Sequence, residues 1–68
     1  MYNSEILKKI VEEFGPVQAY LFCKMEARRM ELICQNGGSL DDMYDFYWWN
    51  SAYNELDEKL KNIEYENA

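Results

Sequence analysis

Few side chains of this sequence could do catalytic chemistry. Cys23 and Cys34 are candidate nucleophiles, and the acidic run of Asp41, Asp42 and Asp45 is a candidate cation site. The chain has no histidine, which excludes Ser-His and Cys-His pairs and imidazole ligands to a metal. It also lacks the glycine patterns of nucleotide-binding loops and the alternating acids of a calcium loop. We therefore expect no catalytic residue, no metal site and no cofactor, and we expect that the protein is not an enzyme.

The two cysteines are placed too far apart for a disulfide within the chain. Cys23 and Cys34 lie in one expected helix, eleven residues apart, which corresponds to about 16 Å along the axis. A disulfide requires Cα atoms within about 7 Å of each other. We interpret both thiols as small apolar groups in a reducing, intracellular setting.

The densest feature of the sequence is a cluster of aromatic residues. Six of the eleven aromatic residues fall within ten positions, namely Tyr44, Phe46, Tyr47, Trp48, Trp49 and Tyr53. Neighbouring rings on a helix point in different directions, at about 100° per residue, so one short helix cannot bury them all. Tyrosine and tryptophan are also enriched at binding hot spots. We predict that this cluster contains a protein-binding surface, although some of its rings are expected to belong to the core.

Breaks in the sequence predict three helices and no strands. Gly15-Pro16 and Asn36-Gly37-Gly38-Ser39 are the two breaks. The predicted helices cover about 4–14, 16–35 and 40–63 of a single small domain, residues 1–68. The fold class is therefore all-α, a compact three-helix domain.

Local signals support these helix boundaries. Asn3 or Ser4 can cap the first helix, which carries its apolar residues on one face. Ser39 with Asp42 resembles a capping box at the start of the third helix.

The second helix is apolar over most of its circumference, which is typical of a surrounded helix. Two short neighbours cannot easily cover it, so this pattern also favours association. Glu26 and Arg29 interrupt the apolar surface three residues apart. Either they form an ion pair on a partly solvated edge, or they form a buried contact that fixes the register of an interface.

The third helix has two apolar stripes, rotated by about half a turn from each other. Leu40, Met43, Tyr44, Tyr47 and Trp48 form the first stripe, and Trp49, Ala52, Tyr53, Leu56, Leu60 and Ile63 form the second. Either the helix kinks near Asn50-Ser51, or it continues and its halves pack against different partners.

Size and charge narrow the possible partners. A chain of 68 residues forms a marginally stable domain, and such domains usually need a disulfide, a metal or a partner. The net charge of −6 disfavours direct binding to nucleic acid or anionic lipid. The sequence contains no apolar run long enough to span a membrane, and residues 1–13 do not resemble a signal peptide. We expect a protein partner, either a second copy or a larger assembly, in the cytoplasm or a virion.

Two segments resemble short uncharacterised helical proteins of crAss-like tailed bacteriophages. They are residues 6–16, Ile-Leu-Lys-Lys-Ile-Val-Glu-Glu-Phe-Gly-Pro, and residues 44–49, Tyr-Asp-Phe-Tyr-Trp-Trp. The resemblance implies either a minor virion component or a small protein that acts on a host factor. It transfers no functional residues.

These observations favour a non-enzymatic interaction or assembly protein, a homo-oligomer or a subunit of a complex. It would self-associate or dock on a larger protein through the aromatic cluster, with Glu26 and Arg29 at the same interface. The alternative is an acidic inhibitor or decoy that binds a basic groove of a nucleic-acid-binding host protein.

Overall fold

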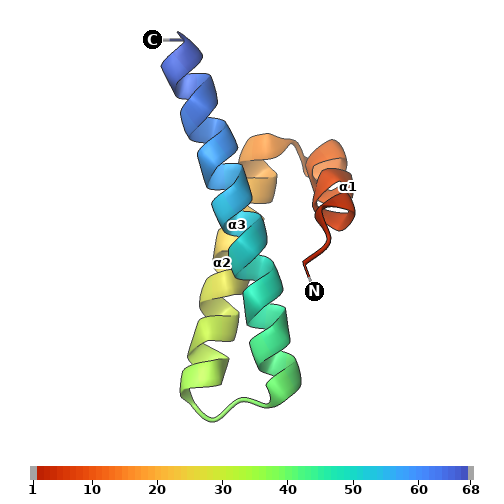
Figure 1. Ribbon diagram of the computed structural model, residues 1–68, viewed down its shortest axis with the longest axis vertical. Helices are drawn as coiled ribbons and strands as arrows, with labels where there is room; N and C mark the ends of the chain where they lie inside the picture. The colour runs from red at the N-terminus through yellow and green to blue at the C-terminus, as the bar shows by residue number, and fades with distance from the viewer. Residues whose placement is uncertain (1, 68) are drawn as a thin grey trace.

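Three helices make up almost all of the chain that the structure describes. The computed structural model describes the backbone of residues 2–67 and the side chains of residues 2–62. Helix α1 is Ser4–Phe14, α2 is Pro16–Gln35 and α3 is Leu40–Asn67, and no strand occurs within residues 2–67 (Figure 1). The predicted all-α, three-helix fold is confirmed.

The starts of α1 and α3 are set by side-chain caps that the sequence predicted. Asn3 Oδ1 accepts a hydrogen bond of 2.9 Å from the backbone N–H of Glu5. Ser39 Oγ accepts a 3.2 Å bond from the N–H of Asp42, and the Asp42 carboxylate accepts a 2.9 Å bond from the N–H of Ser39. This reciprocal pair is a capping box, and it satisfies two backbone donors that the helix itself leaves free.

The joint between α1 and α2 consists of one residue. Gly15 has a φ of +82°, a conformation that costs glycine little and other residues much more. Pro16 follows at the first position of α2, where its missing N–H has no helical partner to lose. The short joint makes α1 turn sharply out of the line of α2 (Figure 1).

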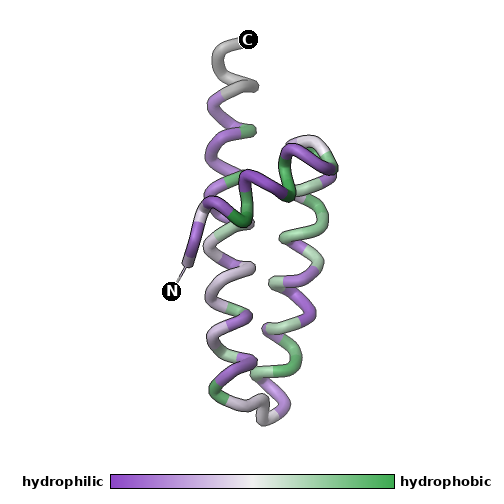
Figure 2. The backbone as a smooth tube through the Cα atoms, turned by 90° about the vertical axis from the view of Figure 1, so that its right-hand side faces the viewer, coloured by the Kyte–Doolittle hydropathy of each residue, from purple (hydrophilic) through white to green (hydrophobic). Residues whose placement is uncertain are grey.

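Helices α2 and α3 form an antiparallel hairpin that sets the long dimension of the molecule. They run side by side in both views, and α1 crosses near the end opposite to their connecting loop (Figures 1 and 2). The longest extent is 43 Å, close to the length of about 42 Å that a helix of 28 residues has by itself. The half of the hairpin next to the loop therefore consists of two helices with no third helix beside them.

The core lies where all three helices meet. Its fully buried members are Leu7 from α1, Ala19 and Cys23 from α2, and Ala52 and Leu56 from α3. Larger side chains pack around these residues without being fully buried, among them Tyr2, Ile10, Val11, Tyr20, Trp48, Trp49 and Tyr53. The small residues let α2 and α3 approach closely, and the rings cover the edges of the contact.

Helix α3 continues without a break through Asn50 and Ser51, so the predicted alternative of an unbroken helix is the one observed. Both residues are half-buried, and the neighbouring Trp49 and Ala52 belong to the packed core, so tertiary packing overrides their poor helix propensity. The helix also extends to Asn67 rather than ending near Ile63, since no glycine or proline follows to stop it. The side chain of Ile63 lies outside the described residues.

Tyr2 ties the N-terminal segment to α3. Its hydroxyl donates a 3.0 Å hydrogen bond to Glu55 Oε2, and its ring centroid lies 5.6 Å from that of Trp48. Burial of the hydroxyl, followed by the hydrogen bond and the negative charge of Glu55, raises the pKa of Tyr2 well above its ordinary value of about 10.

We predict that replacing a buried leucine of α3 destabilises the protein much more than replacing an exposed leucine of the same helix. Leu56 is 3% exposed and Leu40 is 64% exposed. Leu56→Ala should lower the free energy of unfolding by about 2–5 kcal/mol, because it leaves a cavity in the core. Leu40→Ala should change it by less than about 0.5 kcal/mol. Urea denaturation in dilute solution measures both, and similar losses would contradict the observed orientation of α3.

We also predict that stability declines at alkaline pH, in part through Tyr2. Below its ordinary pKa the phenol of Tyr2 is neutral in both the folded and the unfolded chain. As the pH rises above about 10, the unfolded chain loses this proton before the folded chain does, so the free energy of unfolding falls. Tyr2→Phe should cost about 0.5–1.5 kcal/mol at neutral pH. The stability of this variant should then fall less steeply than that of the wild type between about pH 10 and pH 12. Parallel urea titrations test this, and identical slopes would exclude Tyr2 as a source.

Candidate protein-binding surfaces

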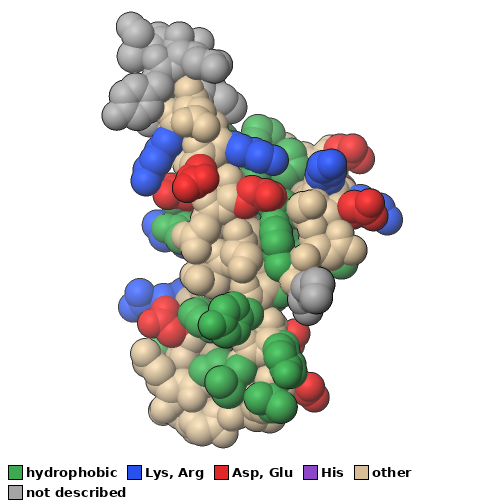
Figure 3. Space-filling view, viewed as in Figure 1, with side chains coloured by type: hydrophobic (Ala, Val, Ile, Leu, Met, Phe, Trp, Pro, Cys, Tyr) green, Lys and Arg blue, Asp and Glu red, His purple; other side chains and the backbone are tan. Residues whose placement is uncertain are grey.

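Four apolar side chains form an exposed stripe on the N-terminal half of α3. Leu40, Met43, Tyr44 and Tyr47, which we call the outer α3 face, follow the i, i+3, i+4, i+7 spacing that places residues on one side of a helix. Tyr44 is 59% exposed and Tyr47 is 68% exposed. Figure 3 shows several hydrophobic side chains gathered on the surface of this half of the molecule, with acidic side chains at its margin.

A shallow hollow adjoins the outer α3 face. It has a volume of about 380 Å³. Its lining combines residues of the N-terminal segment and of α3, namely Tyr2, Tyr44, Asp45, Tyr47, Trp48 and Ser51. Asp45 therefore places a carboxylate beside the two exposed tyrosines.

The other four rings of the predicted cluster are half-buried, and three of them pack on rings of other elements. Trp48 lies 5.6 Å from Tyr2, Trp49 lies 5.5 Å from Phe22, and Tyr53 lies 5.4 Å from Tyr20, measured between ring centroids. Phe46 lies beside Tyr47, with its ring centroid 6.4 Å away, and is also half-buried. The cluster thus divides into two exposed rings, three rings that pack on other elements, and the half-buried Phe46.

Glu26 and Arg29 form an ion pair at the edge of α2. Arg29 Nη2 lies 2.8 Å from Glu26 Oε2, and the Arg29 side chain is 58% exposed. The hydrogen bond and the charge of Glu26 raise the pKa of Arg29, and the carboxylates of Asp42 and Asp45 add to this effect. The Glu26 side chain is only 16% exposed, so the pair joins an exposed guanidinium to a largely buried carboxylate. Its role at an interface stays a prediction.

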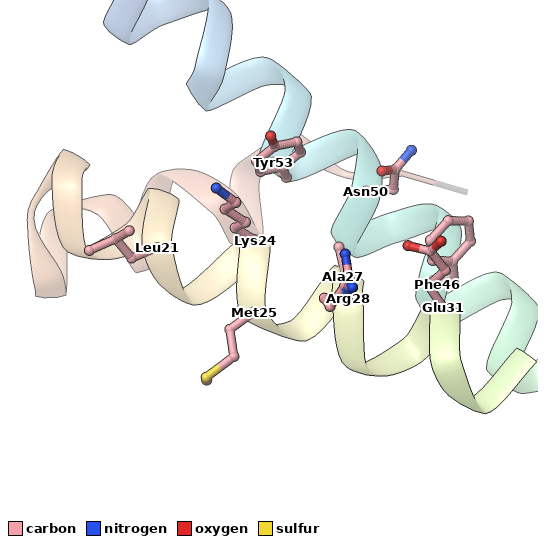
Figure 4. Close-up of a pocket in the computed structure, with 9 residues that line it drawn as sticks. All are labelled: Leu21, Lys24, Met25, Ala27, Arg28, Glu31, Phe46, Asn50 and Tyr53. Carbon is pink, nitrogen blue, oxygen red and sulfur yellow. The ribbon is translucent and has the colours of Figure 1, made fainter.

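A second hollow, which sequence reasoning did not locate, has a volume of about 470 Å³ and is lined by residues of both α2 and α3 (Figure 4). We call it the α2 groove. Ala27 of α2 and Phe46 and Tyr53 of α3 are among its lining residues, together with Leu21 and Met25, and Met25 points away from α3 (Figure 4).

Two basic side chains stand at the edge of the α2 groove, Lys24 and Arg28, together with the carboxylate of Glu31 and the amide of Asn50. The Lys24 ammonium also lies 6.0 Å from the centre of the Tyr20 ring. The only sequence signal for this groove was that the second helix is apolar over most of its circumference. The other lining residues come from α3, which is too far along the chain for a local sequence pattern to indicate the contact.

The two cysteines differ in their accessibility. Cys23 is buried and Cys34 is half-buried, and both are free thiols. Burial raises the pKa of Cys23, which disfavours the reactive thiolate. Among the described side chains, no three acidic or thiol groups lie close enough together to hold a metal ion. Within residues 2–67, no helix has both the length and the apolar content needed to cross a membrane.

Comparison of the chain with protein-family models, curated proteins and solved structures finds no match. Geometry and charge are therefore the basis for any assignment of function. They point to two unfilled surfaces, the outer α3 face and the α2 groove.

We predict a clear difference in reactivity between the cysteines. At neutral pH a thiol-reactive alkylating agent should modify Cys34 in the folded protein and should reach Cys23 only after unfolding, because the first thiol is partly accessible and the second is not. Mass spectrometry of peptides from native and urea-treated samples measures both rates. Equal native rates would contradict the observed burial of Cys23.

Proposed function

We propose that this protein is a non-enzymatic assembly protein that associates with itself through the outer α3 face. The observation that carries the proposal is the stripe of Leu40, Met43, Tyr44 and Tyr47, whose side chains are 47–68% exposed and lie outside the core cluster. Scattered apolar residues are normal on protein surfaces, but a contiguous apolar patch marks an interaction site.

The chemistry of the stripe suits a binding surface. Tyrosine offers a large contact area with few rotatable bonds and keeps a hydroxyl for a hydrogen bond, so it is common at hot spots. Methionine adapts to irregular partners because it is unbranched and flexible. A patch of one helical face is small, so we expect association in the micromolar range rather than a permanent dimer.

Self-association would also stabilise a domain that is too small to be more than marginally stable by itself. The buried core consists of a few side chains, three of which are alanine or cysteine at the centre of the helix pair. A partner that binds only the folded chain shifts the folding equilibrium toward that chain. The resemblance to phage proteins makes a minor virion component the setting that we favour for such an assembly.

The acidic decoy is the second candidate, and it is favoured by one observation. Asp41 and Asp45 are exposed on the same half of α3, and the chain has no lysine or arginine between Arg29 and Lys59. A basic groove of a host protein would complement this charge. A decoy of this kind has no reason to associate when it is purified alone, so the next experiment separates the two candidates.

We predict that the purified protein exceeds its monomer mass of 8.2 kDa as its concentration rises. Tyr44→Ser/Tyr47→Ser should shift the protein to monomer, because it removes the two most exposed rings of the stripe while leaving the core intact. Size-exclusion chromatography with light scattering, from about 10 µM to about 500 µM, covers the range expected of a small interface.

Phe14→Ser is the matched control for that variant. The exposed fraction of Phe14, 56%, is similar to that of Tyr44, 59%. Phe14 lies at the end of α1, however, where its ring stacks on Phe22. This variant should retain the association of the wild type. A wild type that stays monomeric throughout, or a double variant that keeps the wild-type mass, would overturn the proposed function.

A further inference from the structure

We infer that the outer α3 face of one copy seats in the α2 groove of a second copy, so that two different surfaces of the same chain meet. This inference rests on the proposed function of the outer α3 face. It adds the identity of the partner surface, which the proposed function leaves open.

Charge decides between the possible pairings. Asp45 lines the hollow beside Tyr44 and Tyr47, and the exposed Asp41 lies one helical turn before Tyr44. A contact between two outer α3 faces would bring these carboxylates near each other. Arg29 of α2 lies near Asp45 but is already paired with Glu26, and α3 itself carries no basic residue before Lys59. Like charges opposed across an interface disfavour that pairing.

The α2 groove supplies the opposite charge. Lys24 and Arg28 stand at its edge, with Glu31 as its single carboxylate. A contact between two α2 grooves would oppose these cations, whereas a crossed contact sets them against Asp41 and Asp45. The crossed pairing is therefore the one that electrostatic complementarity favours.

Shape and chemistry favour the same pairing. An amphipathic helix that binds in a groove anchors itself through residues at i, i+3, i+4 and i+7, which is the spacing of the outer α3 face. The small side chain of Ala27 leaves room in the groove, and Leu21 and Met25 provide apolar surface. In Figure 4 Met25 points away from α3, where it can contact a helix laid along the groove.

The two surfaces lie on different sides of the hairpin, so one copy can offer both. On α2 the buried residues Ala19, Cys23 and Ala27 share one face. The exposed Leu21 and Met25, which line the outer side of the α2 groove, lie across the helix from that face. The stripe on α3 likewise lies away from its core residues Ala52 and Leu56. A contact between unlike surfaces links copies head to tail, unless a rotation closes the set.

Mixing two variants tests the inference. The face variant is Tyr44→Ser/Tyr47→Ser, and the groove variant is Leu21→Ser/Met25→Ser, in which both replaced residues are at least half exposed. Each variant alone should be monomeric, with an affinity for itself about tenfold or more below that of the wild type. An equimolar mixture should regain a complex, because the groove variant keeps an intact outer α3 face and the face variant keeps an intact groove.

Analytical ultracentrifugation with a fluorescent label on one variant measures the mixed complex, and circular dichroism checks that each variant is folded. Each labelled variant with its own unlabelled form is the control. If the groove variant associates like the wild type while the face variant is monomeric, two outer α3 faces pair with each other; the inference then fails and the proposed function stands. If both variants are monomeric and the mixture stays monomeric, the inference also fails. A monomeric wild type overturns both proposals.

Discussion

The close contact between α2 and α3 is the constraint on which the rest of the structure depends. Four of the buried residues on these two helices are small, namely Ala19, Cys23 and Ala27 of α2 and Ala52 of α3. Side chains of this size let two helices approach closely but fill little space between them. The large aromatic residues therefore cannot occupy the centre of the hairpin. They pack at its edges, where they stay half-buried, or face outward.

The position of α1 decides which rings face outward. Leu7 brings α1 onto Ala19, Cys23 and Leu56, near the end of the hairpin opposite to the loop. The loop half is left as a layer of two helices, and such a layer cannot bury both sides of its helices. The outer α3 face lies in this half, and the α2 groove begins there. The same arrangement that completes the core at one end leaves unfilled surfaces at the other.

Much of the fold could be predicted from the sequence, because the decisive signals are local. Asn3, Gly15-Pro16 and the Ser39–Asp42 capping box set the helix boundaries by contacts within a few residues. The orientation of α3 could be predicted only in part. The 4-3-4-3 spacing of Trp49, Tyr53, Leu56 and Leu60 favours packing of that stripe on the first or second helix, and Leu56 is in the core. Its contact with a helix nearly fifty residues earlier in the chain could not be derived from local spacing. The α2 groove was missed for the same reason, since its walls come from two helices.

Trp48 and Trp49 connect the core to the outer α3 face. Their ring centroids lie 4.9 Å apart, with Trp48 packed toward Tyr2 and Trp49 toward Phe22. Tyr44 lies one helical turn before Trp48 and lines the same hollow. A partner on the outer α3 face would thus lie next to rings that also pack on the N-terminal segment and on α2. Because such a partner binds only the folded chain, association and folding stability should rise together in this protein.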